Sequence, residues 1–253
     1  MKFLAVTDLH YADKALGEGD RHHSQSLERL KEALKYCDDC DFIINLGDTA
    51  DSFSESRDQR TLLSEVKAVL DASGKPYYNI IGNHDTSIVK TEFYTLFNMK
   101  NRYYAFDTTE YRIIVLDACL NDVNDPIPKE EIIWDDCYID GEQKNWLVTQ
   151  LRDSDKKVIV FTHVPFMLSE RETDDPHLIK NRDEIMDVFE KSGKVSAVFS
   201  GHYHSGTYGK SGGIHYVTFA SMCVGDKNSF AVVEAGENSI VINGFGNIPS
   251  YTL

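Results

Sequence analysis

The first ten residues of the chain are Met1-Lys2-Phe3-Leu4-Ala5-Val6-Thr7-Asp8-Leu9-His10, and their pattern decides the expected fold. The apolar run within Lys2–Thr7 predicts a short buried strand. Asp8 and His10 follow at once, and because one residue separates them, both side chains can point the same way from extended backbone. Ligands in open α/β sheets bind just beyond the carboxyl ends of the strands. The stretch therefore predicts a strand with a functional site at its end.

Four further strand-like runs end in the same way. The clusters and the runs they follow are Gly47-Asp48 after Phe42–Leu46, Gly82-Asn83-His84-Asp85 after Tyr77–Ile81, His163 after Val158–Thr162, and Gly201-His202-Tyr203-His204 after Val195–Ser200. Taken singly, each cluster is compatible with an ordinary polar turn. However, together with the first cluster, which contains His10, these clusters hold five of the chain's nine histidines. Five strand ends that carry Asp, Asn and His therefore favour one shared site.

The residue types in these clusters indicate bound metal. Carboxylate, amide and imidazole ligands without thiolate suit Mn, Fe or Zn. One ion needs fewer ligands than the clusters supply, and a carboxylate can bridge two ions, so we expect two adjacent divalent or trivalent metal ions. The predicted ligands are Asp8, His10, Asp48, Asn83, His163, His202 and His204.

Helical patterns separate several of the strand-like runs, which predicts an α/β fold with largely parallel strand pairing. Helices are predicted over Ser26–Tyr36 and Arg60–Leu70 and around Trp146–Leu151, and a further strand over Ile113–Leu116. No helical pattern interrupts the strand-like runs after residue 201, so these runs predict an antiparallel second sheet packed on the first. They are Gly213–Ala220, Ser229–Glu234 and Ser239–Asn243.

The sequence shows no internal repeat, low-complexity tract or flexible linker, so we expect one domain over residues 1–253. The segment 121–141 breaks the regular pattern, because it holds two prolines, many acids, Trp134 and Tyr138. Loops of this length in compact domains usually have a function. We therefore expect a long loop or a small lid over this segment.

Composition narrows the range of partners. Lys and Arg number 26 against 41 Asp and Glu, which gives a formal net charge of −15. A surface this acidic repels nucleic-acid backbones and anionic lipid, so we expect neither nucleic acid nor membrane as a partner. The apolar run at the start is too short for a secretory signal, and the odd, scattered cysteines suit a reducing compartment. We expect a cytoplasmic protein.

These motifs, in this order, resemble the calcineurin-like metallophosphoesterase superfamily, whose pattern is D-x-H, G-D-x-x-D, G-N-H-D, a single H and G-H-x-H. The resemblance implies an α/β/β/α sandwich of two mixed sheets with the site on their joined edge. It also implies two ligand sets that share Asp48 as a bridge. One ion would take Asp8, His10, Asp48 and His204, and the other would take Asp48, Asn83, His163 and His202.

Softer signals resemble the manganese-dependent ADP-ribose/CDP-alcohol diphosphatase group. They are the stretches Arg21-His22-His23-Ser24, Gln143-x-x-Trp146-Leu147 and Gly213–Thr218. The resemblance implies hydrolysis of a small phosphorylated, nucleotide-derived substrate. His10 stands where members of this group often carry Gln, so a cyclic-nucleotide phosphodiesterase stays an alternative. A metal-bearing scaffold without hydrolysis is the third interpretation.

In the expected mechanism, a metal-bound hydroxide attacks phosphorus. We expect His84 to act as general acid, Asp85 to orient its imidazole, and Asp51 to support the site from behind. Six residues are weaker candidates for substrate contact, because ordinary packing or solvation explains each of them as well. They are Tyr11, His22, His23, Trp134, Tyr138 and Arg171. The sequence does not determine the oligomeric state.

Overall fold

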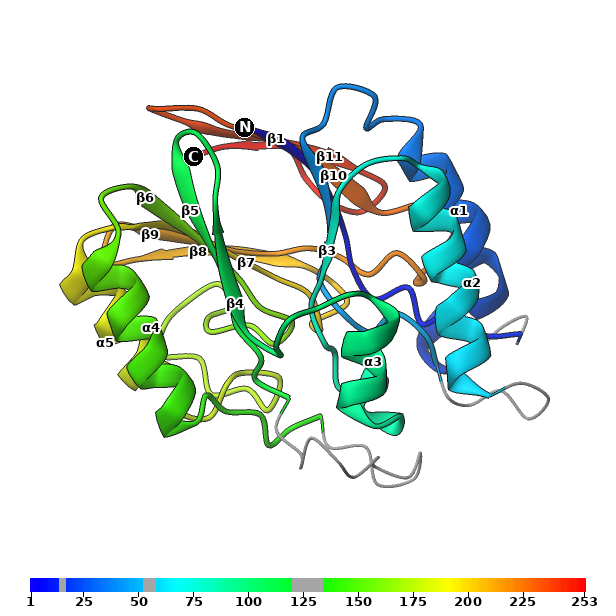
Figure 1. The fold of residues 1–253 in the computed structure, drawn as a ribbon, viewed down its shortest axis with the longest axis horizontal. Coiled ribbons are helices and arrows are strands. Elements are labelled where there is room, and N and C mark those ends of the chain that lie inside the picture. The colour runs from blue at the N-terminus through cyan, green and yellow to red at the C-terminus, as the bar shows by residue number, and fades with distance from the viewer. Residues whose placement is uncertain (14–16, 52–57, 120–133) are drawn as a thin grey trace.

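Two six-stranded sheets face each other in the middle of the molecule, and helices cover their outer faces (Figure 1). The structure is a computed structural model that describes residues 1–13, 17–51, 58–119 and 134–253. One sheet has the strand order β12-β11-β10-β1-β2-β3, and the other has the order β4-β5-β6-β7-β9-β8. This is the α/β/β/α sandwich of two mixed sheets that the sequence predicted.

The strands of the first sheet are β1 (Lys2–Val6), β2 (Phe42–Asn45), β3 (Tyr77–Asn79), β10 (Phe230–Ala235), β11 (Ile240–Phe245) and β12 (Tyr251–Thr252). Those of the second sheet are β4 (Tyr104–Asp107), β5 (Tyr111–Val115), β6 (Lys157–Phe161), β7 (Val195–Ser200), β8 (Thr207–Ser211) and β9 (Ile214–Thr218). The α-helices are α1 (Ser26–Leu34), α2 (Gln59–Ala72), α3 (Lys90–Leu96), α4 (Gly141–Asp153) and α5 (Arg182–Ser192). The described residues also form the short 3-10 helices η1 (Glu18–Asp20), η2 (His23–Gln25) and η3 (His84–Ser87).

Alternation along the strands builds three apolar layers. Residues of one strand face, such as Phe3, Ile44 and Phe161, fill the space between the two sheets. Residues of the opposite face of the first sheet, such as Leu4, pack against α1, α2 and α3. The outer face of the second sheet, which includes Val160, packs against α4 and α5. Strands buried on both faces read as continuous apolar runs, which is why the sequence located them well.

All nine predicted strands and all three predicted helices are present, but the arrangement of the C-terminal strands differs from the expectation. They do not form an antiparallel sheet of their own. Strand β10 pairs antiparallel with β1, and β9 pairs parallel with β7. Since β1 and β7 would otherwise each expose an unpaired edge, the C-terminal strands complete both sheets.

Part of the predicted lid segment 121–141 can be placed. Residues 121–133 lie outside the described residues, whereas Trp134 to Gly141 are described and lead into α4. Asp140 caps that helix by accepting a hydrogen bond from the backbone N–H of Gln143. Among the helices that the structure describes, none is long and apolar enough to cross a membrane.

Five strands direct their carboxyl ends to one edge of the sandwich. Strands β1, β2 and β3 run parallel in the first sheet, and β6 and β7 run parallel in the second. Hydrogen bonds join segments that follow strands of different sheets, such as His202 N to Asp8 Oδ2 at 3.0 Å and His163 Nδ1 to Leu46 O at 2.8 Å. The loops after these strands therefore meet where the two sheets join.

Phe3 is the side chain on which the contact between the sheets can be tested. It is fully buried, and its ring contacts Phe42 in its own sheet and Phe161 and Phe199 in the opposite sheet. Phe3→Ala should lower the free energy of unfolding by about 3–5 kcal/mol, measured by urea denaturation. Val148→Ala on the exposed side of α4 is the control and should change it by no more than about 0.5 kcal/mol. Equal effects of the two substitutions would contradict this packing.

Candidate metal centre

The backbone at the strand ends is held in an unusual conformation. Of the six described non-glycine residues with positive φ, four are predicted metal ligands: Asp8 (50°), His10 (42°), Asp48 (51°) and His202 (66°). A left-handed conformation costs about 1–3 kcal/mol at such residues and persists only where the surroundings enforce it. Strain concentrated on these four residues indicates that the fold stabilises a functional geometry at this edge.

Glycines allow the segments to approach one another closely. A Cβ atom at Gly82 would lie 2.1 Å from Asp48 Oδ1, and one at Gly201 would lie 1.9 Å from Thr7 Oγ1. Neither distance is compatible with a side chain, so both positions require glycine. The glycines that precede Asn83 and His202 in the motifs are therefore needed for close packing around Asp48 and Asp8.

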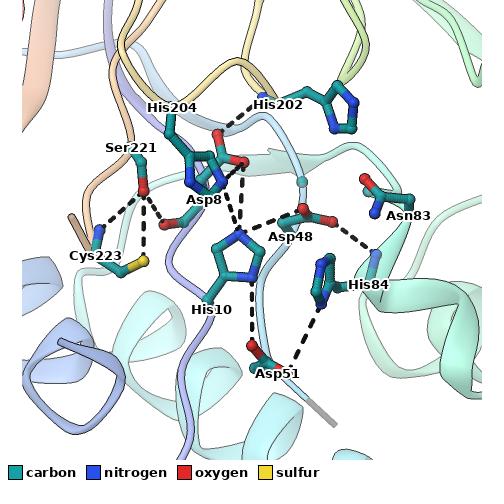
Figure 2. A network of polar contacts seen from close by, with 12 residues as sticks. Asp8, His10, Asp48, Asp51, Asn83, His84, His202, His204, Ser221 and Cys223 are labelled. Atoms are coloured by element: carbon teal, nitrogen blue, oxygen red, sulfur yellow. Dashed lines mark hydrogen bonds and ion pairs between the residues drawn. The ribbon is translucent and has the colours of Figure 1, made fainter. Parts of the chain in front are cut away.

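Four side chains converge on a first position (Figure 2). His10 Nε2 lies 3.1 Å from His204 Nε2. Asp8 Oδ1 is 3.4 Å from His204 Nε2 and 3.7 Å from His10 Nε2. Asp48 Oδ2 lies 3.5 Å from His10 Nε2. Two ring nitrogens and two carboxylate oxygens thus surround one small volume, and Asp8, His10 and His204 have the spacing of a metal site.

A second group of side chains lies on the other side of Asp48. Asp48 Oδ2 is 3.3 Å from His163 Nε2, which in turn is 3.2 Å from Asn83 Oδ1. Asp48, His163 and His202 form another set with the spacing of a metal site. Asp48 Oδ2 therefore faces both groups of side chains. The other carboxylate oxygen, Asp48 Oδ1, accepts a hydrogen bond from the backbone N–H of His84 at 2.8 Å.

Backbone carbonyls fix two of the imidazole rings from behind. His163 Nδ1 lies 2.8 Å from the carbonyl oxygen of Leu46, and His202 Nε2 lies 3.1 Å from that of Trp134. An N–H that donates to a carbonyl leaves the other ring nitrogen with its lone pair, as is usual for histidines that bind metal. His163 Nε2 and His202 Nδ1 are therefore the nitrogens available to an ion.

The protonation states also suit a cation. Burial opposes the charge of Asp8, but contacts with His10 and His204 hold its pKa well below the usual value. Burial lowers the pKa of His10 to about 3 and that of His202 to about 3, so both rings are neutral at pH 7. Asp8 Oδ1 is buried and has no hydrogen-bond partner among the described residues. Burial lowers the pKa of His163, but Asp48 outweighs it and raises that pKa to about 10, so an ion that binds at Nε2 would displace a proton from this ring. Buried carboxylates beside two neutral imidazoles and a displaceable proton fit divalent metal ions.

His84 contacts Asp51 and not Asp85, which corrects the expectation for its orienting partner. His84 Nδ1 lies 3.8 Å from Asp51 Oδ1. Burial lowers the pKa of His84, but Asp48 and Asp51 outweigh it and raise that pKa above the usual value. The Asp85 carboxylate instead accepts backbone hydrogen bonds from Gly82 at 3.0 Å and Thr49 at 2.9 Å. Asp85 points into the turn because these buried N–H groups need an acceptor.

Asp51 contacts two more histidines. Its Oδ2 lies 3.7 Å from His10 Nδ1 and 3.6 Å from His23 Nδ1. His23 is buried, and its Nδ1 is 2.7 Å from the carbonyl oxygen of His10. His23 is thus not solvated, which was one interpretation of it, and the structure places it behind His10.

Three other candidates for substrate contact are engaged with the protein. The Tyr11 hydroxyl donates to Glu65 at 2.7 Å, and its ring is buried against α2. His22 Nε2 lies 3.2 Å from Asp20 at the surface. The Arg171 guanidinium pairs with carboxylates of α5, among them Glu190 at 2.7 Å, so it is not available as the predicted phosphate contact.

The two aromatic candidates of the lid segment differ in position. Trp134 is 42% exposed, and its carbonyl accepts from His202, so it lies at the centre. Tyr138 is 43% exposed, and its backbone N–H donates to Ala118 O, with no ring contact among the described residues. Beside Trp134 lies His177, which the sequence did not single out because a lone histidine in a loop carries no motif.

Overlapping clusters of carboxylates and imidazoles at the joined edge of an α/β/β/α sandwich define a metal-dependent phosphoesterase. The model of the calcineurin-like phosphoesterase family matches residues 1–206. The chain belongs to this family.

Individual relatives agree with this assignment. The chain is 27% identical to a manganese-dependent ADP-ribose/CDP-alcohol diphosphatase of Arabidopsis thaliana, over 98% of this chain and 95% of the relative. It is 26% identical to a probable cyclic nucleotide phosphodiesterase of Fibrobacter succinogenes, over 81% of this chain and 73% of the relative. The crystal structure of a dimetal phosphatase from Danio rerio has the same fold, with a TM-score of 0.87, 21% identity, and coverage of 100% of this chain and 98% of that one.

The contacts of Asp51 and Asp85 predict different effects of neutralising each carboxylate. Asp51→Asn should lower kcat by about 10- to 100-fold at saturating Mn²⁺, the usual effect of losing a charged group that supports the candidate ligands of a metal site from behind. Asp85→Asn removes one of two acceptor oxygens from buried N–H groups, so it should mainly lower the melting temperature. Both are measured by steady-state kinetics and thermal unfolding. A larger loss of kcat in Asp85→Asn than in Asp51→Asn would restore the original assignment.

Proposed function

We propose that the chain hydrolyses a phosphoanhydride bond in a small nucleotide-derived substrate such as ADP-ribose. Two divalent metal ions at the strand ends take part, with Mn²⁺ as the first choice. The observation that carries the proposal is the position of Asp48 Oδ2, which faces His10 at 3.5 Å on one side and His163 at 3.3 Å on the other. A single carboxylate oxygen between two ligand groups suits a pair of ions that it bridges.

The proposed ligand sets follow the two groups of side chains. One ion would be held by Asp8, His10, Asp48 and His204, and the other by Asp48, Asn83, His163 and His202. When bound, such a pair lowers the pKa of a water molecule, supplies a hydroxide nucleophile and neutralises phosphoryl oxygens. Local positive charge of this kind explains how a chain with a net charge of −15 can accept a phosphorylated substrate.

His84 is the proposed general acid. Its backbone N–H is fixed by Asp48 Oδ1, and its ring lies 4.5 Å from the ring of His10, between centroids. Burial lowers the pKa of His84, but Asp48 and Asp51, whose Oδ1 lies 3.8 Å from Nδ1, outweigh it and raise that pKa, which favours a proton on the ring for the leaving oxygen. His84 would thus contact substrate without serving as a metal ligand.

The relatives support the substrate class. The Arabidopsis diphosphatase aligns with this chain over nearly the full length of both, and its name gives ADP-ribose and CDP-alcohols as substrates. The cyclic nucleotide phosphodiesterase aligns over less of each chain. We propose a cytoplasmic enzyme of one domain, with cyclic nucleotides as the second substrate class.

A substrate panel tests the proposed specificity. In Mn²⁺, kcat/KM should be higher for ADP-ribose and CDP-choline than for cyclic AMP, because the relative that aligns over nearly the full length of both chains is named for ADP-ribose and CDP-alcohols. It should also be higher than for a phosphopeptide, because the acidic surface repels the phosphates and acids around a phosphosite. The rates are measured by chromatography of the products after dialysis against chelator and reloading with metal. A clear preference for cyclic AMP or for the phosphopeptide would contradict the substrate class. No hydrolysis of any member would favour the scaffold alternative.

Replacement of His84 tests its role. His84→Ala should lower kcat by about two to four orders of magnitude, the usual range for a lost general acid. Bound Mn²⁺, measured by elemental analysis, should stay near the wild-type amount, because His84 is not a proposed ligand. His215→Ala is the matched control, since His215 pairs with Tyr208 on the second sheet and should affect neither quantity. Loss of both ions from His84→Ala would show that the role is wrong.

A further inference from the structure

Three aromatic side chains adjoin the candidate ligand His202. The ring of His177 lies 5.5 Å from that of His202, 4.9 Å from that of Trp134 and 5.4 Å from that of Tyr203, between centroids. We call Trp134, His177 and Tyr203 the aromatic ledge. His177 is its centre, because it contacts both other members and the candidate ligand.

The ledge is fixed from two directions. The Asp175 carboxylate accepts hydrogen bonds from both the backbone N–H and Nδ1 of His177, at 2.9 and 2.7 Å. The carbonyl of Trp134 accepts from His202 Nε2 at 3.1 Å, which ties the ledge to the metal centre. The central ring is therefore set in place before any substrate arrives, which lowers the entropy cost of binding on it.

The rings remain accessible although they surround a buried centre. Trp134 is 42% exposed, and the His177 side chain is 35% exposed, whereas His202 is 7% exposed. An indole gains little from such a position through packing alone, because much of its surface stays in water. Exposed aromatic surface beside a catalytic centre suits a flat ligand group that stacks on it.

The position of the ledge matches the shape of a nucleotide. Because the ring of His177 lies 5.5 Å from that of His202, the nucleoside attached to a phosphate held near His202 would bring its base over the rings of the ledge. We propose that the aromatic ledge binds the nucleobase of the substrate by stacking, with His177 as the central contact. The inference rests on the proposed function, since it assumes that phosphate is held at the metal centre.

Binding of two phosphates that differ in the base tests the ledge independently of turnover. AMP carries a base, and ribose 5-phosphate does not, so the dissociation constants of both for the Mn²⁺-loaded enzyme are measured by calorimetry. His177→Ala should weaken AMP about 5- to 150-fold, the range for loss of one base–aromatic contact, and leave ribose 5-phosphate unchanged. Trp134→Ala, which keeps the backbone carbonyl that accepts from His202, should act in the same direction.

Two further variants separate stacking from other roles. His177→Phe keeps a flat ring and should bind AMP within about threefold of wild type. His215→Ala is the control, because His215 lies in β9 and pairs with the Tyr208 hydroxyl, and this variant should bind both ligands as wild type does. The proposal is contradicted if wild type binds AMP no more tightly than ribose 5-phosphate, or if His177→Ala weakens the binding of both ligands equally. Failure of the proposed function would appear instead as absence of nucleotide hydrolysis by the wild type.

Discussion

The buried carboxylate of Asp48 sets the main electrostatic constraint of this molecule. It is 1% exposed and lies between histidines supplied by both sheets, among them His10 and His163. A carboxylate in such a place is stable only if nearby groups balance its charge. Five strand ends meet around it and supply the groups that balance its charge, so the ligand groups depend on how the two sheets join. In the proposed active form, two cations provide the balance.

Part of the free-energy cost of this site lies in the backbone conformation around it. Positive φ at Asp8, Asp48 and His202 and close approach at Gly82 and Gly201 are unfavourable for the local chain and are tolerated because the surrounding sheets are rigid. The large core between the sheets, with Phe3 at its centre, provides this rigidity. The stability of the core thus allows the backbone at the site to remain strained, and such a trade-off between stability and function is common in enzymes.

The convergence of the candidate ligands was predictable because a strand of the core precedes each of them and polar groups there gain nothing from packing. Contacts that depend on the path of a loop were not predictable. Asp85 follows His84 directly, yet the chain turns so that Asp51 contacts the ring instead. His177 lies in a loop without periodicity, and its place beside His202 follows from the fold alone. The sequence pattern located the C-terminal strands but did not show which strands they pair with, because strand pairing depends on residues far apart in the sequence.

We propose that Asp48 bridges two metal ions, and anomalous diffraction from crystals grown with Mn²⁺ is the decisive measurement. We expect two manganese peaks, one beside Asp8, His10 and His204 and one beside Asn83, His163 and His202, with Asp48 bound to both ions. A single peak, or peaks away from Asp48, would contradict it.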